Sequence, residues 1–328
     1  MYKVSIIVVI YNAKKYIKPV FDAIFAQTHK DLEVFAVING NHDESKELIA
    51  SNYPQVELLD LGRNTWFAEG NNIGIKKSTG EFVLLVNQDL ILSPDYVEKV
   101  LNSFKDSKVA AATGKLLRYD FVNNRKTNII DSTGVVMSVT GRARDRGQNQ
   151  EDKGQYKSGE VFGVSGAGPM YRRSALEKVK YCETSPNPSS RGGELLCEYF
   201  DEDFVAYWED VDLSWRLNRA GFKNVYNSVA VGYHGRTAGQ AKGGYLHFWN
   251  FIKHHQKLSP EIRKLNYKNH ILMYIKNAPF IFHPAFVLRE IIMFVYILLF
   301  EPSTLKILPQ LFRIILKVLK KRSLSWKG

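Results

Sequence analysis

The sequence predicts an α/β protein with a doubly wound, mostly parallel sheet, for three reasons. Continuous apolar runs, such as residues 3–10 (KVSIIVVI), are too short for helices and are typical of strands buried on both faces. Segments with apolar residues at helical spacing separate these runs. Polar residues, often Asn or Asp, follow where the runs end. Alternating strands and helices form βαβ units, whose ligands bind at the carboxyl ends of the strands.

The first half of the chain supplies this alternation element by element. After the run at 3–10, apolar residues recur at helical spacing in 14–27, and acidic residues open a predicted helix at 43–52. We expect strands at 3–10, 33–38, 56–61, 81–86 and 109–117, and helices at 14–27, 43–52, 68–78 and 95–104. The loops after the strands, where a site is expected, are 11–13, 38–43, 62–67 and 87–90.

Beyond residue 118 the pattern is less regular. Residues 119–159 are rich in Gly, Asn and Arg, which predicts a hairpin and a mobile loop. Residues 162–170 are expected to form a glycine-rich turn, and 184–194 a surface loop. Further helices are expected at 173–179, 209–220 and 243–255, and one or two strands within 223–231.

Positive charge is concentrated at the C-terminal end. The 328 residues carry a formal net charge of +12, and residues 257–328, with 13 Lys and Arg against three Glu, carry +10 of it. A near-neutral body with a basic, apolar end favours an anionic membrane surface as partner rather than nucleic acid.

With only Cys182 and Cys197, we exclude a disulfide framework and expect two unpaired thiols, as in a reducing cytosol. The first ten residues do not have the pattern of a signal peptide.

Asp89 follows the apolar run at 81–86, within Asn87-Gln88-Asp89. A carboxylate at the end of a strand is suited to hold a divalent cation that bridges two phosphates, because such cations take hard oxygen ligands. An ordinary turn explains the same residues.

Glu209 and Asp210 begin a predicted helix, directly after Tyr207 and Trp208. One of these acids, walled by aromatic rings, is a candidate general base toward a hydroxyl group, and the rings are candidates to stack on a sugar. The alternative is that the acids only complement the helix dipole and the rings only pack in the core.

His234 and Arg236 lie in another polar loop, around Gly235. Imidazole suits a transition metal such as Mn²⁺ and also hydrogen-bonds phosphate, and arginine in a glycine-flanked loop can approach a diphosphate. A purely structural histidine is the alternative.

The predicted helix at 68–78 contains Gly70, Asn71 and Asn72, which are poor helix formers. A close approach of a ligand or of a neighbouring backbone would account for them. The segment is not a P-loop, because the chain contains neither Gly-Lys-Ser/Thr nor Gly-x-Gly-x-x-Gly.

Four motifs occur in order within residues 3–240: SIIVVIYN (5–12), GRNTWFAEGNNIGIKKSTGEFVLLVNQD (62–89), SGAGPMYRR (165–173) and YWEDVDLSWRLNRAGFKNVY (207–226). Together they resemble the family 2 inverting glycosyltransferases of the GT-A fold, and among these the rhamnosyltransferase-like branch of cell-surface polysaccharide assembly. The resemblance implies a nucleotide-diphospho-sugar donor (dTDP-rhamnose or a UDP-sugar), a divalent cation (Mg²⁺ or Mn²⁺), a glycan or lipid-linked acceptor, and inversion at the anomeric carbon.

The resemblance also assigns roles by position. Asp210 is expected to be the catalytic base, with Glu209 in support, and Asp89 and His234 are expected to bind the metal. The expected donor-binding residues are Tyr11, Asn12, Asn39, Asn41, Asn72, Asn87, Gln88 and Arg236, and the expected acceptor-side residues are Gly166, Ala167, Gly168 and Trp208.

Two positions depart from the family pattern. Ile38 stands where an acid often binds the nucleotide base, so base recognition passes to Asn39, Asn41 or Asp43. Asn87 replaces the first acid of an Asp-x-Asp metal motif, which lowers the charge of the site by one.

Two other functions use similar parts. A nucleotidyltransferase also combines an α/β sheet with metal-binding acids, but it normally needs a basic phosphate-binding loop near the N-terminus, which is absent here. An inactive membrane-associated nucleotide-sugar binding protein is the second alternative. The joint presence of Asp89, Asp210 and His234 argues against it.

Residues 1–240 are thus predicted to form the GT-A domain, with a donor half at 1–118 and an acceptor half at 119–240. The rest, 241–328, is predicted to be a helical, membrane-associating extension. The ten apolar residues at 291–300 fall short of the roughly 20 that span a bilayer. In 305–322 basic residues recur opposite Leu, Ile, Phe and Val, which is typical of a helix in the membrane interface. Packing on the domain or on a partner, and a re-entrant hairpin, are the alternatives. We expect a cytoplasmic protein held at the inner leaflet.

Overall fold

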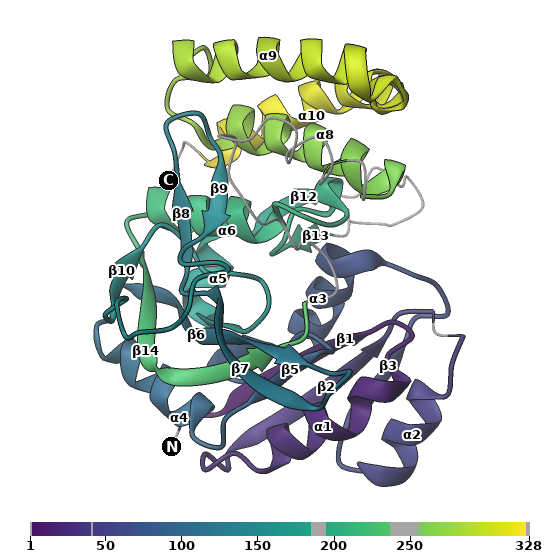
Figure 1. Cartoon of the computed structure of the whole chain (residues 1–328), viewed down its shortest axis with the longest axis vertical. Coiled ribbons are helices and arrows are strands. Elements are labelled where there is room, and N and C mark those ends of the chain that lie inside the picture. The colour runs from purple at the N-terminus through teal and green to yellow at the C-terminus, as the bar shows by residue number, and fades with distance from the viewer. Residues whose placement is uncertain (1, 41, 185–194, 237–254, 256–257, 326–328) are drawn as a thin grey trace.

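The computed structural model describes residues 2–40, 42–184, 195–236, 255 and 258–325, and Figure 1 shows its architecture. Its main sheet has ten strands in the order β10-β14-β6-β11-β4-β1-β2-β3, with β5 beside β14 and β7 beside β6. These strands are β1 (Val4–Ile10), β2 (Leu32–Ile38), β3 (Glu57–Asp60), β4 (Phe82–Leu85), β5 (Leu90–Leu92), β6 (Val109–Asp120), β7 (Arg125–Ser132), β10 (Gly159–Val161), β11 (Pro169–Arg172) and β14 (Lys223–His234).

Helices cover both faces of the sheet, and the C-terminal helices form a further layer at one end of the molecule (Figure 1). They are α1 (Lys14–Phe25), α2 (Ser45–Asn52), α3 (Trp66–Lys77), α4 (Tyr96–Leu101), α5 (Arg173–Val179), α6 (Glu209–Arg219), α8 (Pro260–Asn277), α9 (Pro284–Phe300) and α10 (Leu308–Ser325). Single 3₁₀ turns lie at Asn102–Lys105, Glu202–Phe204 and Pro302–Ile307. Two small hairpins complete the described chain, β8 (Val135–Met137) with β9 (Ala143–Asp145), and β12 (Tyr181–Thr184) with β13 (Leu195–Glu198).

The predicted α/β class is confirmed. Strands β1 to β4 form a parallel block in which β1 pairs with both β2 and β4. β11 then runs antiparallel to β4 and β6, and β14 runs parallel to β6, so the second half of the sheet is mixed. The first strand is buried on both faces as predicted, because Ile6 and Val8 pack in one hydrophobic core and Ile7 packs in the other.

Helix α3 lies so close to β1 that small residues are needed on its inner face. A Cβ atom added at Gly74 would lie 2.5 Å from Ile7 Cγ2, and one at Gly70 would lie 3.2 Å from Val9 Cγ1. The glycines of this helix are therefore explained by close packing against side chains of β1.

The predicted hairpin within 119–159 is present, and a loop follows at residues 146–158, between β9 and β10. β6 continues to Asp120 and pairs with β7, with two register shifts in the pairing, and β8–β9 adds a second hairpin. The shifts interrupt the alternation of apolar and polar residues, which hides these strands in the sequence. The expected turn at 162–170 ends in β11. The predicted helix at 243–255 and most of the predicted loop at 184–194 lie outside the described residues.

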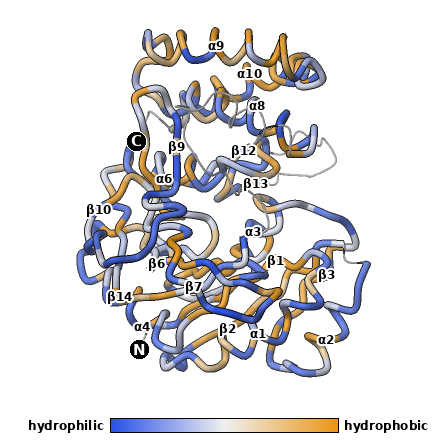
Figure 2. The backbone as a smooth tube through the Cα atoms, viewed as in Figure 1, coloured by the Kyte–Doolittle hydropathy of each residue, from blue (hydrophilic) through white to orange (hydrophobic). Residues whose placement is uncertain are grey.

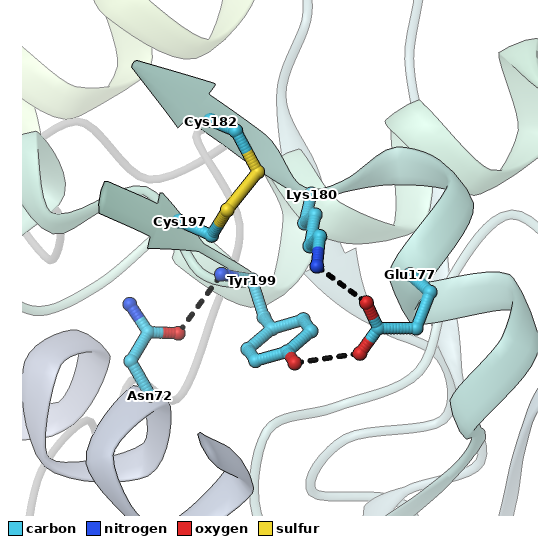
Figure 3. Close-up of a disulfide and its surroundings, with 6 residues drawn as sticks. All are labelled: Asn72, Glu177, Lys180, Cys182, Cys197 and Tyr199. Carbon is cyan, nitrogen blue, oxygen red and sulfur yellow. Dashed lines mark hydrogen bonds and ion pairs between the residues drawn. A yellow bond between two sulfur atoms is a disulfide. The ribbon is translucent and has the colours of Figure 1, made fainter. Parts of the chain in front are cut away.

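The expectation of two unpaired thiols is also wrong. Cys182 and Cys197 lie directly opposite each other on β12 and β13, with Cα atoms 4.1 Å apart, and form a disulfide (Figure 3). Tyr199, just after β13, donates its hydroxyl to Glu177 at 2.6 Å and its backbone N–H to Asn72 at 3.1 Å. The hairpin is thereby joined to both α5 and α3. The sequence could not show this pairing, because the register of the two strands depends on tertiary structure.

The C-terminal helices form a separate layer in which α9 is outermost (Figure 1). Helix α9 exposes most of its apolar side chains, and Figure 2 shows it as largely hydrophobic. Those at least 37% exposed are Val287, Leu288, Ile291, Ile292, Phe294, Val295, Leu298, Leu299 and Phe300. Among the described helices, none alone is long and apolar enough to cross a membrane. Pro284–Phe300 and Pro302–Ser323 meet that test only as a pair, bent by 117°.

Helix α10 turns part of its predicted basic face toward the protein. Lys321 is only 1% exposed and points into the protein, and Lys317 pairs with Asp203 at 2.8 Å. Phe312 and Leu316 point outward instead, 67% and 74% exposed. The helix packs on α8, as the alternative of a docked helix predicts, because its lysines find acidic partners in the main domain.

These partners form a buried network of charges between the C-terminal layer and the segment before α6. Lys276 on α8 contacts Asp201 and lies 2.7 Å from Asp212 Oδ1, and all three side chains are fully buried. Lys321 on α10 lies 2.6 Å from Asp201 Oδ1, and Arg216 lies 3.0 Å from Asp212 Oδ2. Burial opposes the charge of Lys276, but the two aspartates raise its pKa, so the pairs stay ionised.

Replacing Lys276 with methionine leaves Asp201 and Asp212 buried with less compensating charge. We expect the free energy of unfolding, measured by chemical denaturation, to fall by about 3–5 kcal/mol, as is typical when one partner of a buried ion pair is removed. Lys46→Met is the matched control, since Lys46 pairs with Asp60 on the surface, where both side chains are more than 40% exposed. The control should leave the unfolding midpoint nearly unchanged. Equal effects of the two substitutions would contradict the role given to the buried network.

Candidate active site

A cavity of about 730 Å³ opens at the carboxyl ends of β1 and β4, the edge that the sequence predicts for a site. Most of the predicted site residues line it. They are Tyr11, Asn39, Asn87, Gln88, Asp89, Gly166, Ala167, Trp208, Glu209, Asp210, His234 and Arg236. Side chains from positions 89, 210 and 234, far apart in the chain, thus meet around one cavity.

Strand pairing brings Asp89 and His234 together. His234 ends β14 opposite Leu90 of β5, so Asp89 lies beside it. His234 Nε2 is 3.2 Å from Asp89 Oδ1, and His234 Nδ1 is 2.8 Å from Oδ2 of Asp131, a fully buried aspartate on β7. Burial opposes a charge on His234, but its hydrogen bonds to Asp131 and Asp89 raise its pKa to about 10. The imidazole therefore carries a proton at neutral pH when no cation is bound.

These residues fit a divalent cation that a bound diphosphate also coordinates. The described residues contain no cluster of three or more His, Cys, Asp or Glu side chains placed to hold a metal. Asp89 and His234 would supply two ligands to such a cation, and Asp131 contacts the other nitrogen of the imidazole, as carboxylates commonly do behind metal-binding histidines. Mg²⁺ in particular is usually held by one or two carboxylates together with substrate phosphates and water.

Arg236 lies on the same side of the cavity and is held by two acids. Its Nη1 lies 3.0 Å from Asp131 Oδ1 and 3.0 Å from Asp145 Oδ2. These ion pairs fix the guanidinium at the cavity wall. Asp131 thus contacts both His234 and Arg236, which makes it the centre of the cationic side of the site.

Glu209 and Asp210 lie at the start of α6, across from the glycine-rich segment 166–168. Asp210 Oδ2 accepts the backbone N–H of Gly166 at 2.8 Å, and Oδ1 accepts that of Val211 at 2.8 Å. Burial and the negative charge of Asp145 outweigh these bonds and raise the pKa of Asp210 to about 6. Burial, with the charge of Asp210, raises the pKa of Glu209 well above its usual range. Burial therefore disfavours a second negative charge on Glu209, next to that of Asp210.

The segment just before these acids has an unusual backbone. Val205, Tyr207 and Trp208 have φ values of 67°, 69° and 75°, a region that costs a side-chain-bearing residue about 1–3 kcal/mol. Asn269 on α8 holds this segment, since its Nδ2 lies 2.8 Å from each of the carbonyl oxygens of residues 204, 206 and 207. Trp208 Nε1 also donates to Asn266 of α8 at 3.1 Å. Through these hydrogen bonds the C-terminal layer fixes the backbone that leads into α6, and with it the position of Asp210.

At the other end of the cavity two exposed aromatic rings, Tyr11 and Trp66, lie near polar loops. They are 41% and 45% exposed. Gln88 fixes the chain at Tyr11, accepting its N–H at 2.7 Å. Asn39 lines the cavity, but its side chain holds the neighbouring loop, donating to Asn64 Oδ1 at 2.9 Å and accepting the N–H of residue 65 at 2.5 Å.

Three predicted site residues do not line the cavity and have other partners in the structure. Asn72 is buried and donates to Phe200 O at 2.7 Å, which makes it a strut between α3 and the segment after β13 (Figure 3). Asn12 forms a turn and accepts the N–H of His42 at 2.9 Å. Gly168 packs behind the wall, where its carbonyl accepts the Tyr96 hydroxyl.

Of the candidates predicted to recognise the nucleotide base, Asn39 lines the cavity. Asp43 does not line the cavity, because its carboxylate accepts the backbone N–H groups of Lys14 and Ser45. Asn41 lies outside the described residues.

Sequence reasoning missed Asp131, Asp145 and Trp66. Trp66 lies in the loop at 62–67, which the pattern marks as a place to look, but no motif singles out the ring. Asp131 and Asp145 lie in the irregular segment whose strands were not predicted. Only the pairing of β7 with β6 and the β8–β9 hairpin bring them to the site.

Comparison with known proteins agrees with this geometry. The model of the family "Glycosyl transferase family 2" matches residues 5–180. A poly-beta-1,6-N-acetyl-D-glucosamine synthase from Staphylococcus aureus (strain COL) is 23% identical over 233 residues, 70% of this chain and 48% of the relative. Glycosyltransferase GlyA from Streptococcus pneumoniae serotype 4 is 26% identical over 121 residues, 36% of this chain and 17% of the relative. The chain thus spans about half or less of the length of these curated relatives.

Two solved structures share the fold. One is the mannosyltransferase PcManGT from Pyrobaculum calidifontis in complex with GDP-Man and Mn²⁺, with a TM-score of 0.53 and 16% identity, covering 94% of this chain and 74% of that one. The other is GalNAc-T7 with UDP, GalNAc and Mn²⁺, with a TM-score of 0.59 and 11% identity, covering 84% and 48%. The predicted GT-A fold is therefore confirmed. Because the family model covers more than half of the chain, the protein belongs to glycosyltransferase family 2.

Proposed function

We propose that this protein is an inverting, metal-dependent glycosyltransferase that moves a sugar from a nucleotide-diphospho-sugar to a glycan or lipid-linked acceptor in cell-surface polysaccharide assembly. One observation carries the proposal: a single cavity combines a candidate base, Asp210, with a candidate cation site at Asp89 and His234. The family supports it, and so do the curated relative named as a polysaccharide synthase and the structural neighbour that holds GDP-Man with Mn²⁺.

Asp210 has the protonation state that a general base needs. With a pKa of about 6 it is ionised at pH 7, yet it is a stronger base than an exposed aspartate. As the acceptor oxygen bonds to the anomeric carbon, its proton passes to Asp210 and the bond from that carbon to the diphosphate oxygen breaks. The raised pKa of Glu209 disfavours a second negative charge beside the base.

The opposite side of the cavity is suited to the departing diphosphate. Asp89 and His234 would hold the divalent cation, with Asp131 fixing the imidazole. A cation bound there would neutralise the negative charge that builds on the diphosphate as the sugar leaves. Arg236, held by Asp131 and Asp145, adds a fixed positive charge nearby.

The aromatic end of the cavity is suited to the nucleoside. Tyr11 and Trp66 offer exposed ring faces on which the nucleotide base can stack. Stacking would compensate for the acid that often binds the nucleotide base in the family, since Ile38 stands at that position. We include dTDP-rhamnose and UDP-sugars as the donors of first choice. Trp208 and the backbone at 166–167 then lie on the acceptor side, next to the base.

We also propose that the protein binds the cytoplasmic face of a membrane through its C-terminal layer. Helix α9 exposes many apolar side chains, and Phe312 and Leu316 of α10 are exposed as well. Lys306, Arg313 and Lys320 are exposed on the following turn and helix, where they can meet anionic headgroups. The sequence predicts membrane binding through the helix at 305–322 alone, whereas the proposed membrane-binding surface includes both α9 and α10.

A panel of nucleotide-sugars, assayed with Mn²⁺ and Mg²⁺, tests the reaction. Asp210→Asn should lower turnover by about 10²–10⁴-fold, because the proton acceptor is lost, while binding of the nucleotide donor stays unchanged. Asp89→Ala should instead weaken Mn²⁺-dependent donor binding, measured by calorimetry. A fully active Asp210→Asn enzyme would exclude Asp210 as the base, and unchanged donor binding in Asp89→Ala would exclude the cation site.

The pH dependence of kcat/KM tests the base separately. The reaction needs ionised Asp210, so kcat/KM should fall about tenfold per pH unit as the pH drops below about 6, the pKa of Asp210. Asp145→Asn removes a negative charge that raises this pKa and should move the acidic limb to lower pH. An acidic limb that stays in place in this variant would assign it to another group.

Flotation with vesicles of phosphatidylcholine and phosphatidylglycerol tests the membrane proposal. The protein should float with anionic vesicles and be released by salt in part, because charge and apolar contact both contribute. Leu299→Asp should reduce the floating fraction several-fold. Val122→Asp is the control, since Val122 is 93% exposed but lies in the turn between β6 and β7. Equal losses in both variants would contradict binding through α9.

A further inference from the structure

A second cavity lies between the β8–β9 hairpin and α9. It has a volume of about 630 Å³, and apolar side chains from both elements form most of its wall, among them Val136, Met137, Leu288, Ile292 and Met293. Figure 1 shows the hairpin rising from the main domain to reach this helix. The cavity therefore joins the catalytic domain to the outermost apolar helix.

Three arginines interrupt this apolar wall, and no acidic residue is among the described residues that line it. Arg142 and Arg144 come from the hairpin and Arg289 from α9. Arg289 contacts Glu290 and lies 2.7 Å from His270 Nδ1, whereas Arg144 makes no ion pair with any residue that the structure describes. Long apolar walls beside guanidinium groups are complementary to an amphiphile with an anionic head.

The second cavity borders the apolar surface of α9 and shares one lining residue with the cavity that contains Asp210. Leu288 and Ile292, which line it, are each 59% exposed and belong to the apolar surface of α9. Arg144 lines this cavity and also the cavity that contains Asp210. A phosphate bound at Arg144 would thus lie at the border of the catalytic cavity, with its lipid chain on the side of α9.

We propose that this second cavity binds the acceptor, and that the acceptor is a glycan carried on a lipid through a phosphate or diphosphate group. The lipid chain lies against Leu288, Ile292 and Met293, the anionic group binds Arg144 with Arg142, and the attached sugar enters the catalytic cavity toward Asp210. The inference rests on the proposed glycosyl transfer and selects the lipid-linked acceptor from the two classes named there. A bulk phospholipid would not require an arginine that lines both cavities.

Binding of farnesyl phosphate to the full chain, below its micelle concentration, tests the site without an acceptor sugar. We expect calorimetry to show binding that is at least tenfold tighter than that of farnesol. Arg144→Gln should abolish most of this preference, because it removes the positive charge. Ile292→Asn should weaken both ligands about tenfold, while Ile291→Asn, which alters a neighbour 57% exposed but not lining the cavity, should change neither.

Three results would overturn the inference: no binding of farnesyl phosphate, equal effects of the substitutions at 291 and 292, or equally tight binding of a short-chain phosphatidic acid. The last result would indicate bulk lipid. Mn²⁺-dependent binding of UDP and GDP, measured in parallel with Ile292→Asn, reports on the catalytic cavity and should be unchanged. If nucleotide-sugars are turned over but the lipid phosphate does not bind, only this inference fails. If the lipid phosphate binds but no nucleotide-sugar is bound or turned over, the proposed function fails.

Discussion

Buried ion pairs between the C-terminal helices and the segment before α6 are the constraint on which the site depends. Lys276 and Lys321 neutralise Asp201 from α8 and α10, and Asp212 of α6 shares Lys276 with it. Such pairs are stable only when every partner is in place, because an uncompensated buried charge is costly. Helices α8 and α10 are thereby fixed to the segment that leads into α6 and to α6 itself, whose second residue is Asp210. The same contacts hold the C-terminal layer and the start of α6 in one arrangement.

Much of the catalytic cavity could be predicted because parallel strands end at the same edge of a sheet. Asp89 ends one apolar run, His234 ends another, and Asp210 begins a helix with acids in its first turn, so each could be found from local pattern alone. The family resemblance then joined them. The boundaries of the predicted strands moved by at most three residues, and the largest shifts are at the carboxyl ends of β6 and β14.

What could not be predicted depends on contacts between distant segments. Asn72 looked like a ligand residue because amides are rare inside helices, yet it bonds to residues 199 and 200. Cys182 and Cys197 looked unpaired because strand register is invisible to composition. The partners of the α10 lysines could not be predicted, because the acids they contact lie more than 100 residues earlier. Asp131 and Asp145 were hidden by irregular strand pairing.

Asn269 illustrates how a single amide group can decide what the chain tolerates. Its Nδ2 serves the carbonyl oxygens of residues 204, 206 and 207, while its Oδ1 is buried with no hydrogen-bond partner among the described residues. Aspartate has nearly the same shape, but its carboxylate would face three oxygens with no hydrogen to offer. Asparagine is therefore required at this position for its protons rather than its volume, and a substitution that looks mildest by size would be among the most disruptive.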